Sequence, residues 1–582
     1  MSMTGVKVPL PTAICSMKYT REEYERFLLA EIDAQKKEYQ DLVCTRALVL
    51  KARGEIFVGR YLSVQGDGML IFKVRNTDSM PRKNSYWTAC YFTDEMGSYK
   101  NWGNLSWADL REDYQRRYSD AYCAWVSKSD NPDFCLIGIK GITLDFASLL
   151  EEDKPIVAFG PKDPPLKYLL NLRELCLDTS NPKVNRILDM DMVKNEWTPS
   201  ILDSQAKFVL IAKQEAQSGN VIAVQGPPGT GKTHRIALYV ADLLEEGRSV
   251  LVVALTNRAL MEVAEKESLE PFLRAGLISK TSLTVDERKE LPELQDVVDN
   301  QCNSAQRHLT LATFYVSSGW ALESEEPPFD YIIMDEASQA LLPMIATTFK
   351  LGQKVMLIGD QNQLSPIVEL SEDLIRRYSW RQMIDGFDSA SKYFGMKSFM
   401  LSDSYRLPER AVKSTGVFYN NRLRSVSAEQ SVPSFASFVN KKGGPVLVSV
   451  TMEVGKKAPA GAFKVIFNMT KKLLEENPKY RIAILSKFRE TTRKLHEFFV
   501  MNWNSGYFPV NLKIETIDRV QGTTEDFCFF LIPNASFQYS VERPLFNVAT
   551  SRARYNTFIV IDEALLKMNM PEEVRNYFLS ME

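Results

Sequence analysis

The sequence predicts an α/β protein with two parallel-sheet domains in tandem, preceded by a stalk helix and a small β-barrel. Near the start, apolar residues recur at helical spacing on a charged segment. Short β-type runs separated by glycines follow, and from about Trp197 onward apolar strands alternate with helices. Strands that are apolar throughout are typical of parallel sheets covered on both faces. The predicted boundaries are 1–44 for the N-terminal segment and stalk helix, 45–150 for the barrel, 151–198 for a linker or second stalk, 199–370 for the first sheet domain and 371–582 for the second.

The composition is that of a globular protein with several folding units. The 582 residues are enough for roughly three or four units. A hydrophobic content of 45%, a charged content of 25% and a formal net charge of −2 give no overall attraction to nucleic acid or to anionic lipid. Any nucleic-acid site must therefore be a local groove.

Targeting and metal-binding patterns are weak. The first residues lack the pattern of a signal peptide, and no run of about 18 apolar residues indicates a membrane span. The eight cysteines are scattered without a C-x-x-C pair, and there are only three histidines. These features favour reduced thiols over disulfides and disfavour a zinc site. We expect a cytoplasmic protein, with a nuclear location left open, and no membrane association.

The predicted stalk helix begins at Thr20, which with Glu23 has the spacing of a capping box. The helix reads REEYERFLLAEIDAQKKEYQDLV and carries one apolar stripe. The residues of that stripe are Tyr24, Leu28, Ile32, Tyr39 and Leu42.

The predicted barrel starts with three β-type runs, ALVLKA, EIFVGRYL and GMLIFKV, which glycines interrupt. Four tryptophans follow, and they could either stack on bases or pack in a core. We favour the core, because tryptophan is mostly buried. The proline-rich KPIVAFGPKDPPLKYL is predicted to be a connector. The four tryptophans are Trp87, Trp102, Trp107 and Trp125.

Ten apolar runs are predicted to form the two parallel sheets, five in each. Those of the first sheet are NVIAVQ, SVLVVALTN, LTLATFYV, YIIMDEA and KVMLIGD. Those of the second sheet are PVLVSV, RIAILS, LKIETID, CFFLIP and NTFIVID. Two similar domains in series predict a cleft between them.

A phosphate-binding loop lies between the strand NVIAVQ and the helix HRIALYVADLLEEG. Its glycines let backbone N–H groups turn toward phosphate oxygens, and the helix N-terminus adds a favourable dipole. We expect Lys232 to neutralise the β- and γ-phosphate oxygens of a nucleotide and the Thr233 hydroxyl to ligate Mg²⁺. The loop comprises Gly226, Pro227, Pro228, Gly229, Thr230, Gly231, Lys232 and Thr233.

Two further strands end in polar residues that suit the same site. The strand YIIM delivers Asp335, a candidate Mg²⁺ ligand, and Glu336, a candidate general base. The strand KVMLI ends in GDQNQL, whose Gln363 is a neutral amide placed to sense the γ-phosphate. Exposed loop acids are the alternative for Asp335 and Glu336, and the preceding phosphate loop disfavours it.

In this order, the segments resemble superfamily 1 helicases, most closely the Upf-like branch that includes senataxin. The resemblance rests on LDSQ, GPPGTGKT, DEASQ and GDQNQL, followed by SYRLPE, FYNNRL, IDRVQG and NVATSRAR. It covers about residues 200–560, whereas the first 195 residues match in architecture only. Thr524, where the family often has an acid, and Ser365 before Pro366 depart from the pattern.

The resemblance implies two RecA-like domains and assigns roles to residues in both. Gln205 would read the adenine, Tyr405 would stack on it, and Arg406 with Arg552 would reach the γ-phosphate across the cleft. A cation that arrives on closure stabilises the transition state selectively. The positions that correspond to nucleic-acid backbone contacts are Thr256, Asn257, Thr313, Ser486, Thr516 and Gly522.

The implied activity is an ATP-dependent helicase or translocase, working 5′ to 3′ on single-stranded nucleic acid, with RNA ahead of DNA. The implied ligands are ATP and Mg²⁺, the motor would be monomeric, and the N-terminal region could take protein partners. The alternative is a nucleic-acid-stimulated ATPase that clamps the strand or displaces proteins without productive unwinding. A binding protein with an inactive ATPase is disfavoured, because the lysine, both acids and both arginines are present.

Overall fold

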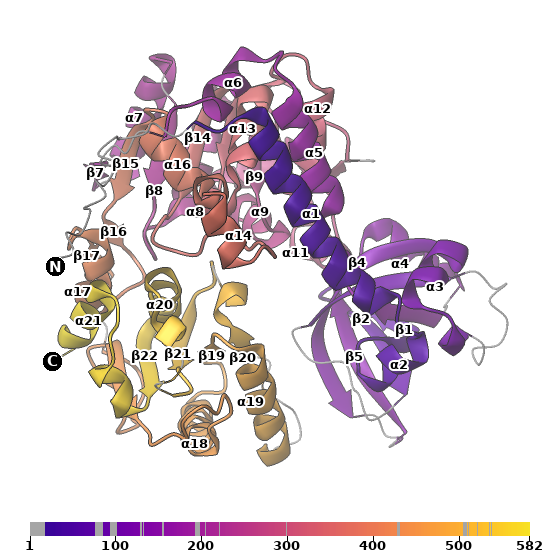
Figure 1. Ribbon diagram of the computed structural model, residues 1–582, viewed down its shortest axis with the longest axis vertical. Helices are drawn as coiled ribbons and strands as arrows, with labels where there is room; N and C mark the ends of the chain where they lie inside the picture. The colour runs from indigo at the N-terminus through magenta and orange to yellow at the C-terminus, as the bar shows by residue number, and fades with distance from the viewer. Residues whose placement is uncertain are drawn as a thin grey trace, which may run out of the picture.

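The computed structural model contains a stalk, a barrel and two sheet domains (Figure 1). It describes residues 18–75, 85–92, 102–128, 131, 133–153, 156–192, 198–203, 205–219, 221–297, 300–427, 431–503, 509, 511–520, 522–534, 536 and 538–581. The N-terminal residues 1–17, which the prediction about a signal peptide concerned, lie outside these ranges. Within them, no helix has the length and apolar character needed to cross a membrane.

The predicted stalk helix is confirmed as α1 (Arg21–Val43), and its capping box is formed. The Thr20 hydroxyl accepts from the Glu23 backbone N–H at 3.2 Å, and the Glu23 carboxylate accepts from Thr20 at 2.7 Å. Tyr24, Phe27 and Leu28 are buried in the core of the first sheet domain. The helix lies beside α5 (Leu166–Leu177) and reaches from the first sheet domain to the barrel (Figure 1).

A buried carboxylate ties α1 to a loop far away in the sequence. Glu31 is 1% exposed and accepts from the backbone N–H groups of Glu369, at 3.0 Å, and Leu370, at 3.2 Å. Burial raises the pKa of Glu31, and these hydrogen bonds oppose the shift. The stalk is thereby joined to the segment that follows the GDQNQL motif.

Replacing Glu31 with alanine is expected to lower the free energy of unfolding by about 2 kcal/mol, because two backbone N–H donors, one of them buried, lose their acceptor. Denaturant unfolding measures the loss, and hydrogen exchange at Glu369 and Leu370 locates it. Glu31→Gln keeps an acceptor oxygen and is the matched control, with a smaller effect. Equal stability of the alanine variant and the wild type would contradict this assignment.

The barrel is closed and antiparallel, with strand order β1-β2-β5-β4-β3-β6. Two sequence predictions are corrected here. ALVLKA forms helix α2 (Ala47–Ala52), since Ala, Leu and Lys favour helix and Ala47 and Leu50 form one buried face. The predicted connector supplies the sixth strand, so the barrel extends beyond residue 150. The strands are β1 (Phe57–Val64), β2 (Leu70–Arg75), β3 (Ser85–Phe92), β4 (Gln115–Lys128), β5 (Phe134–Lys140) and β6 (Ile156–Gly160).

Core packing accounts for Trp107 and Trp87, whereas Trp125 is half-buried. Trp107 is fully buried against Gly160, where a Cβ would lie 2.3 Å from the indole ring. Trp87 makes an edge contact with Phe57 at 4.9 Å between ring centroids. The side chain of Trp102 lies outside the described part of the chain.

The first sheet domain has a nine-stranded sheet with order β11-β10-β12-β9-β13-β14-β8-β15-β7, in which every described pairing is parallel. All five predicted strands are confirmed, and four strands are additional: β10 and β11 at one edge of the sheet, and β15 and β7 at the other. Because β15 belongs to this sheet, the first domain continues past the predicted boundary at residue 370. The strands are β7 (Ser200–Leu202), β8 (Ile222–Gln225), β9 (Val250–Ala254), β10 (Ile278–Thr281), β11 (Gln295–Val297), β12 (Leu309–Thr313), β13 (Phe329–Met334), β14 (Gly352–Gly359) and β15 (Lys397–Leu401).

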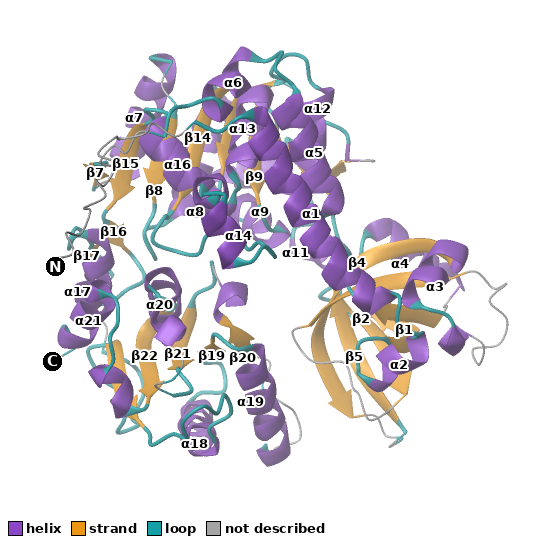
Figure 2. Ribbon diagram, in the orientation of Figure 1, coloured by secondary structure: helices purple, strands orange, loops and turns teal. Residues whose placement is uncertain are grey.

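Helices cover both faces of this sheet, which explains why its strands are apolar throughout (Figure 2). Ile222 and Val224 of β8 pack toward one set of helices, whereas Ala223 between them packs toward the other. The first set is α7 (Gln205–Gln217), α8 (Lys232–Glu245) and α9 (Asn257–Ala264), and the second is α12 (Phe314–Glu323), α13 (Leu342–Leu351) and α16 (Gly386–Tyr393).

The second sheet domain has a five-stranded parallel sheet with order β18-β22-β21-β19-β20, and all five predicted strands are present. Its helices are α17 (Glu409–Thr415), α18 (Ala460–Glu476), α19 (Arg489–Asn502), α20 (Arg543–Thr550) and α21 (Glu572–Leu579). The strands are β18 (Gly444–Ser449), β19 (Ile482–Ser486), β20 (Leu512–Thr516), β21 (Glu525–Leu531) and β22 (Ala553–Ile561).

Candidate active site

The phosphate loop follows β8 and ends at the first turn of α8. Gly229 and Gly231 have φ values of +75° and +73°, which L side chains rarely adopt. A Cβ on Gly226 would lie 2.2 Å from Cγ of Lys232, so glycine is required there for the lysine to lie across the loop. These glycines form the turn that directs backbone N–H groups toward a bound phosphate.

Lys232 and two acids lie at the same edge of the first sheet. The Lys232 ammonium donates to the Gly226 carbonyl at 2.6 Å. Burial lowers its pKa, and the nearby Asp360 and Asp335 carboxylates act in the opposite direction. A buried ammonium beside a glycine loop suits the phosphates of a nucleotide. Thr233 at the start of α8 and the buried Asp335 suit a Mg²⁺ ion that also takes phosphate oxygens.

Lys232→Ala is expected to weaken ATP binding about 100-fold, because a charge-assisted contact to phosphate contributes up to about 3 kcal/mol. Fluorescence anisotropy with a labelled ATP analogue measures the affinity. Lys289→Ala, at an exposed lysine of the same domain, is the matched control. An affinity within a few-fold of the wild type would remove Lys232 from the phosphate site.

Glu336 has a strained backbone in a buried acidic environment. Its φ of 53° and ψ of 34° are left-handed, a conformation that costs a non-glycine residue on the order of 1 kcal/mol and persists mainly at functional sites. Burial, followed by the charge of Asp335, raises the pKa of Glu336 to about 8. Gly522 of the second domain approaches it, since a Cβ there would lie 3.5 Å from Glu336 Oε1. The candidate base therefore lies at the domain boundary.

Asp360 is a buried carboxylate that organises the segment containing Gln363. Its Oδ2 accepts from Gln363 Nε2 at 2.7 Å and from the Tyr419 hydroxyl at 2.6 Å. Its Oδ1 accepts from Gln225 Nε2 at 3.3 Å and from the Asn362 backbone N–H at 3.2 Å. Gln363, the candidate γ-phosphate sensor, is thus held on one side by the Asp360 carboxylate.

Arg406 and Arg552 lie together on the second-domain side of the cleft. Burial and then the charge of Arg552 lower the pKa of Arg406 to about 9, and burial lowers that of Arg552. Neither arginine forms an ion pair within the described residues. Arg552 Nη2 donates to Gln363 Oε1 at 3.1 Å, across the cleft. Two guanidinium groups without a counter-ion, one buried and one half-buried, form a site for an anion such as a γ-phosphate.

Of the two candidate adenine residues, Tyr405 lies beside the phosphate loop. The Tyr405 backbone N–H donates to the Gly229 carbonyl at 2.8 Å, and its ring is 45% exposed. An exposed ring beside the loop is available for stacking. Gln205 is the first residue of α7, and its side chain lies outside the described part of the structure, so its role stays a prediction.

The candidate nucleic-acid positions lie at strand ends in both domains. Thr256 caps α9, accepting from the Ala259 N–H at 3.2 Å, and Thr313 ends the neighbouring β12. Asn257 Oδ1 is buried and has no hydrogen-bond partner among the described residues. In the second domain Ser486 and Thr516 lie opposite each other in register.

The hydroxyl groups at these positions differ in how accessible they are to a nucleic-acid strand. Ser486 is 1% exposed, and its hydroxyl donates to the Leu531 carbonyl at 2.9 Å. Thr516 is buried as well. The barrel approaches this part of the second domain, where Arg519 lies 5.7 Å from the centroid of the exposed Tyr86 ring. Contacts from Ser486 and Thr516 to a strand stay predictions.

Sequence reasoning missed three residues that organise the cleft, namely Asp360, Tyr419 and Asn547. Asp360 directly follows an apolar strand, as Asp335 does, so the same pattern could have identified it. Tyr419 and Asn547 lie in the motifs FYNNRL and NVATSRAR, but no strand-end pattern assigns them a role, because that role depends on contact between distant segments.

Two family models, each described as an AAA domain, match residues 210–369 and 386–564. Helicase sen1 of Schizosaccharomyces pombe is 25% identical over 258 residues, covering 41% of this chain and 15% of that protein. The chain belongs to the Upf-like and senataxin-like family within superfamily 1. The first matched segment contains strands β8 to β14 of the first sheet, and the second contains β15 and all five strands of the second sheet.

Other relatives of this superfamily 1 helicase are much longer. DNA replication ATP-dependent helicase/nuclease DNA2 of Saccharomyces cerevisiae is 28% identical over 204 residues, covering 34% of this chain and 13% of the relative. Regulator of nonsense transcripts 1 of Caenorhabditis elegans is 23% identical over 422 residues, covering 62% of this chain and 38% of the relative. The chain spans less than half the length of each of these relatives.

Proposed function

We propose that the protein is an ATP-driven motor that moves 5′ to 3′ along single-stranded nucleic acid, and that RNA is its preferred strand. The observation that carries this proposal is the convergence of residues from both sheets on one cleft. Arg552 of the second domain contacts Gln363 of the first at 3.1 Å, and Gly522 lies against Glu336. Such a site is complete only when the domains are close, which links the nucleotide to domain closure.

Each residue then has a role in hydrolysis. Lys232 binds the β- and γ-phosphates, and Glu336 accepts a proton from the attacking water. Gln363, Arg406 and Arg552 contact the γ-phosphate from the two sides of the cleft. A Mg²⁺ ion held by Thr233 and Asp335 would neutralise charge on the phosphate oxygens. Loss of the γ-phosphate removes the anion between the arginines, so the domains reopen and their grip on the strand changes.

ATPase stimulation by matched RNA and DNA oligonucleotides tests the activity and the preference. RNA should stimulate at least as strongly as DNA if hydroxyl and amide contacts include the sugar 2′-OH. A fluorescent-duplex unwinding assay, run beside a protein-displacement assay, separates an unwinding motor from a clamp or remodeller. No stimulation by either strand would contradict the proposal.

The binding of single-stranded nucleic acid is expected to depend only weakly on salt concentration. The net charge is −2, and the candidate contacts are hydroxyls, amides and backbone groups. The slope of log affinity against log salt should be no steeper than about −3, or roughly four neutralised phosphates. Titrations with poly-U and poly-dT, with and without a non-hydrolysable ATP analogue, measure it. A steep slope, or tight binding to a single base sequence, would overturn the backbone-contact model.

A further inference from the structure

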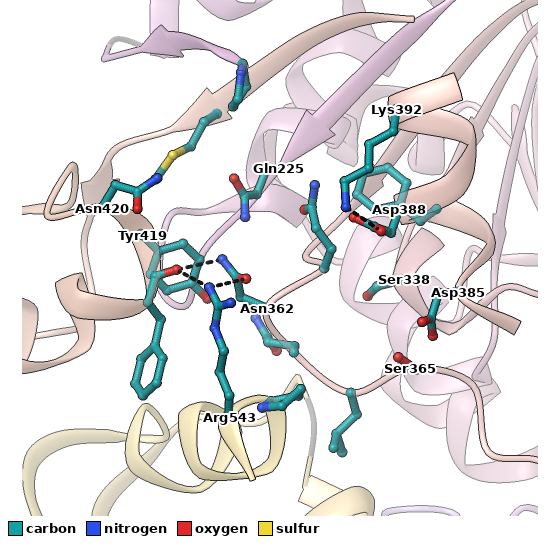
Figure 3. Close-up of a pocket in the computed structure, with 18 of the residues that line it drawn as sticks. Gln225, Ser338, Asn362, Ser365, Asp385, Asp388, Lys392, Tyr419, Asn420 and Arg543 are labelled. Carbon is teal, nitrogen blue, oxygen red and sulfur yellow. Dashed lines mark hydrogen bonds and ion pairs between the residues drawn. The ribbon is translucent and has the colours of Figure 1, made fainter. Parts of the chain in front are cut away.

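Hydrogen bonds from the second domain converge on residues 360–364, which we call the sensor segment. Tyr419, Asn547, Arg543 and Arg552 all donate to it, and Asn362 Nδ2 donates back to the Phe418 carbonyl at 2.8 Å. Figure 3 shows Tyr419, Asn362 and Arg543 close together. All three line a cavity of about 490 Å³, to which both domains contribute residues. The sensor segment is therefore the main polar contact described between the two domains on this side of the cleft.

Tyr419 occupies the centre of these contacts. Its hydroxyl donates to Asp360 Oδ2 at 2.6 Å and accepts from Asn547 Nδ2 at 2.7 Å. A phenol hydroxyl has one proton to donate, and here that proton is used in the hydrogen bond to Asp360. Asn547 Nδ2 also donates to the Asn362 carbonyl at 2.8 Å. The hydroxyl therefore joins an acid of the first domain to an amide of the second.

The Tyr419 ring belongs to the second domain. It is 2% exposed and packs in the core that contains Leu407, Phe546 and Val548. Because this core fixes the ring, the hydroxyl follows any movement of the second domain relative to the first. Asp360 Oδ2 accepts from both Tyr419 and Gln363, so loss of the tyrosine bond changes the carboxylate that holds the Gln363 amide.

We infer that Tyr419 is a positioning residue for ATP hydrolysis, whose hydroxyl orients Gln363 through Asp360 when the domains are close. The inference rests on the proposed function, since it assigns Tyr419 to the same γ-phosphate site. Tyr419 does not touch the nucleotide in this role. It transmits the position of the second domain to the Gln363 amide, by way of one buried carboxylate.

The test is Tyr419→Phe, which removes the hydroxyl and keeps the ring in its core. The kcat of strand-stimulated ATP hydrolysis should fall about tenfold, with the KM for ATP within about threefold, as expected for the loss of one charge-assisted hydrogen bond. Tyr480→Phe is the matched control. It is a buried tyrosine of the same domain, and its hydroxyl bonds to the Pro433 carbonyl instead of to the first domain.

A double-mutant cycle separates positioning from general destabilisation. If Tyr419 acts through Gln363, adding Tyr419→Phe to Gln363→Ala should change kcat by less than about twofold. Independent losses that multiply would overturn the inference, as would a kcat of Tyr419→Phe within about twofold of the wild type.

Hydrogen exchange at residues 360–364 in the nucleotide-free protein supplies a readout that does not need hydrolysis. Exchange there should be about tenfold faster in Tyr419→Phe than in the wild type and unchanged in Tyr480→Phe. Unchanged exchange in Tyr419→Phe would overturn the inference. A wild-type protein without strand-stimulated hydrolysis would instead overturn the proposed function, and the exchange result would still decide whether Tyr419 holds the sensor segment.

Discussion

Replacing Glu336 with glutamine is expected to lower the turnover of ATP by about 10³, the usual contribution of a general base. The amide keeps the size of the side chain and cannot accept the proton of the attacking water. Glu336 is mostly buried behind the phosphate loop and against Gly522 of the second domain, so bulk water is a poor substitute. ATP affinity should stay within a few-fold, because Lys232 and the loop amides are unchanged.

The same variant should accumulate in the ATP-bound form and hold its strand longer than the wild type. Single-turnover hydrolysis and strand dissociation, measured on one preparation, test both expectations. Glu326→Gln, at an exposed acid of the same domain, provides the control. Wild-type turnover in Glu336→Gln would exclude Glu336 as the general base.

Arg552→Ala is also expected to lower turnover by about 10³, the lower end of what an arginine finger contributes. The reason is its place in the cleft, where its guanidinium is 2% exposed, reaches Gln363 at 3.1 Å and forms no ion pair among the described residues. Since it contacts the nucleotide only when the domains are close, ATP affinity should change by no more than a few-fold.

Two further variants make this experiment specific. Arg552→Lys keeps the charge but loses the hydrogen bonds to Gln363 and to the Val548 carbonyl, so partial activity would separate charge from geometry. Arg575→Ala removes an exposed arginine from the same domain and should hydrolyse ATP at the wild-type rate. Equal rates for Arg552→Ala and the wild type would mean that the second domain does not act in hydrolysis.

The strand-and-helix pattern of the sheet domains could be read from the sequence because it is local. A strand such as β8, with Ile222 and Val224 on one side and Ala223 on the other, is apolar throughout, since helices cover both faces. Gly226, Lys232 and Asp335 could be predicted for the same reason, because each is next to such a strand or helix. The family resemblance supplied the arginines, which no local pattern identifies.

Elements at the edges of domains were harder to predict. ALVLKA has the apolar content of a strand, but its helix is decided by packing of Ala47 and Leu50 against the barrel. β15 follows three short helices, and its membership in the first sheet depends on pairing with β8, far away in the sequence. The roles of Tyr419 and Asn547 could not be predicted for the same reason, because contacts across a cleft leave no periodic signal in the sequence.

The passage of the chain from one sheet domain to the other has a mechanical consequence. After β15 ends at Leu401, the chain enters the second domain directly, and Ser404 donates to the Pro228 carbonyl at 3.1 Å while Tyr405 donates to Gly229 at 2.8 Å. The segment that connects the two sheet domains, which we call the hinge, is therefore held against the phosphate loop by these two hydrogen bonds. In a rotation about a hinge, displacement grows with distance from the axis. A small rotation produced near the phosphates would thus move the strand ends at Ser486 and Thr516, on the other side of the second sheet, much farther than it moves Arg406 beside the hinge.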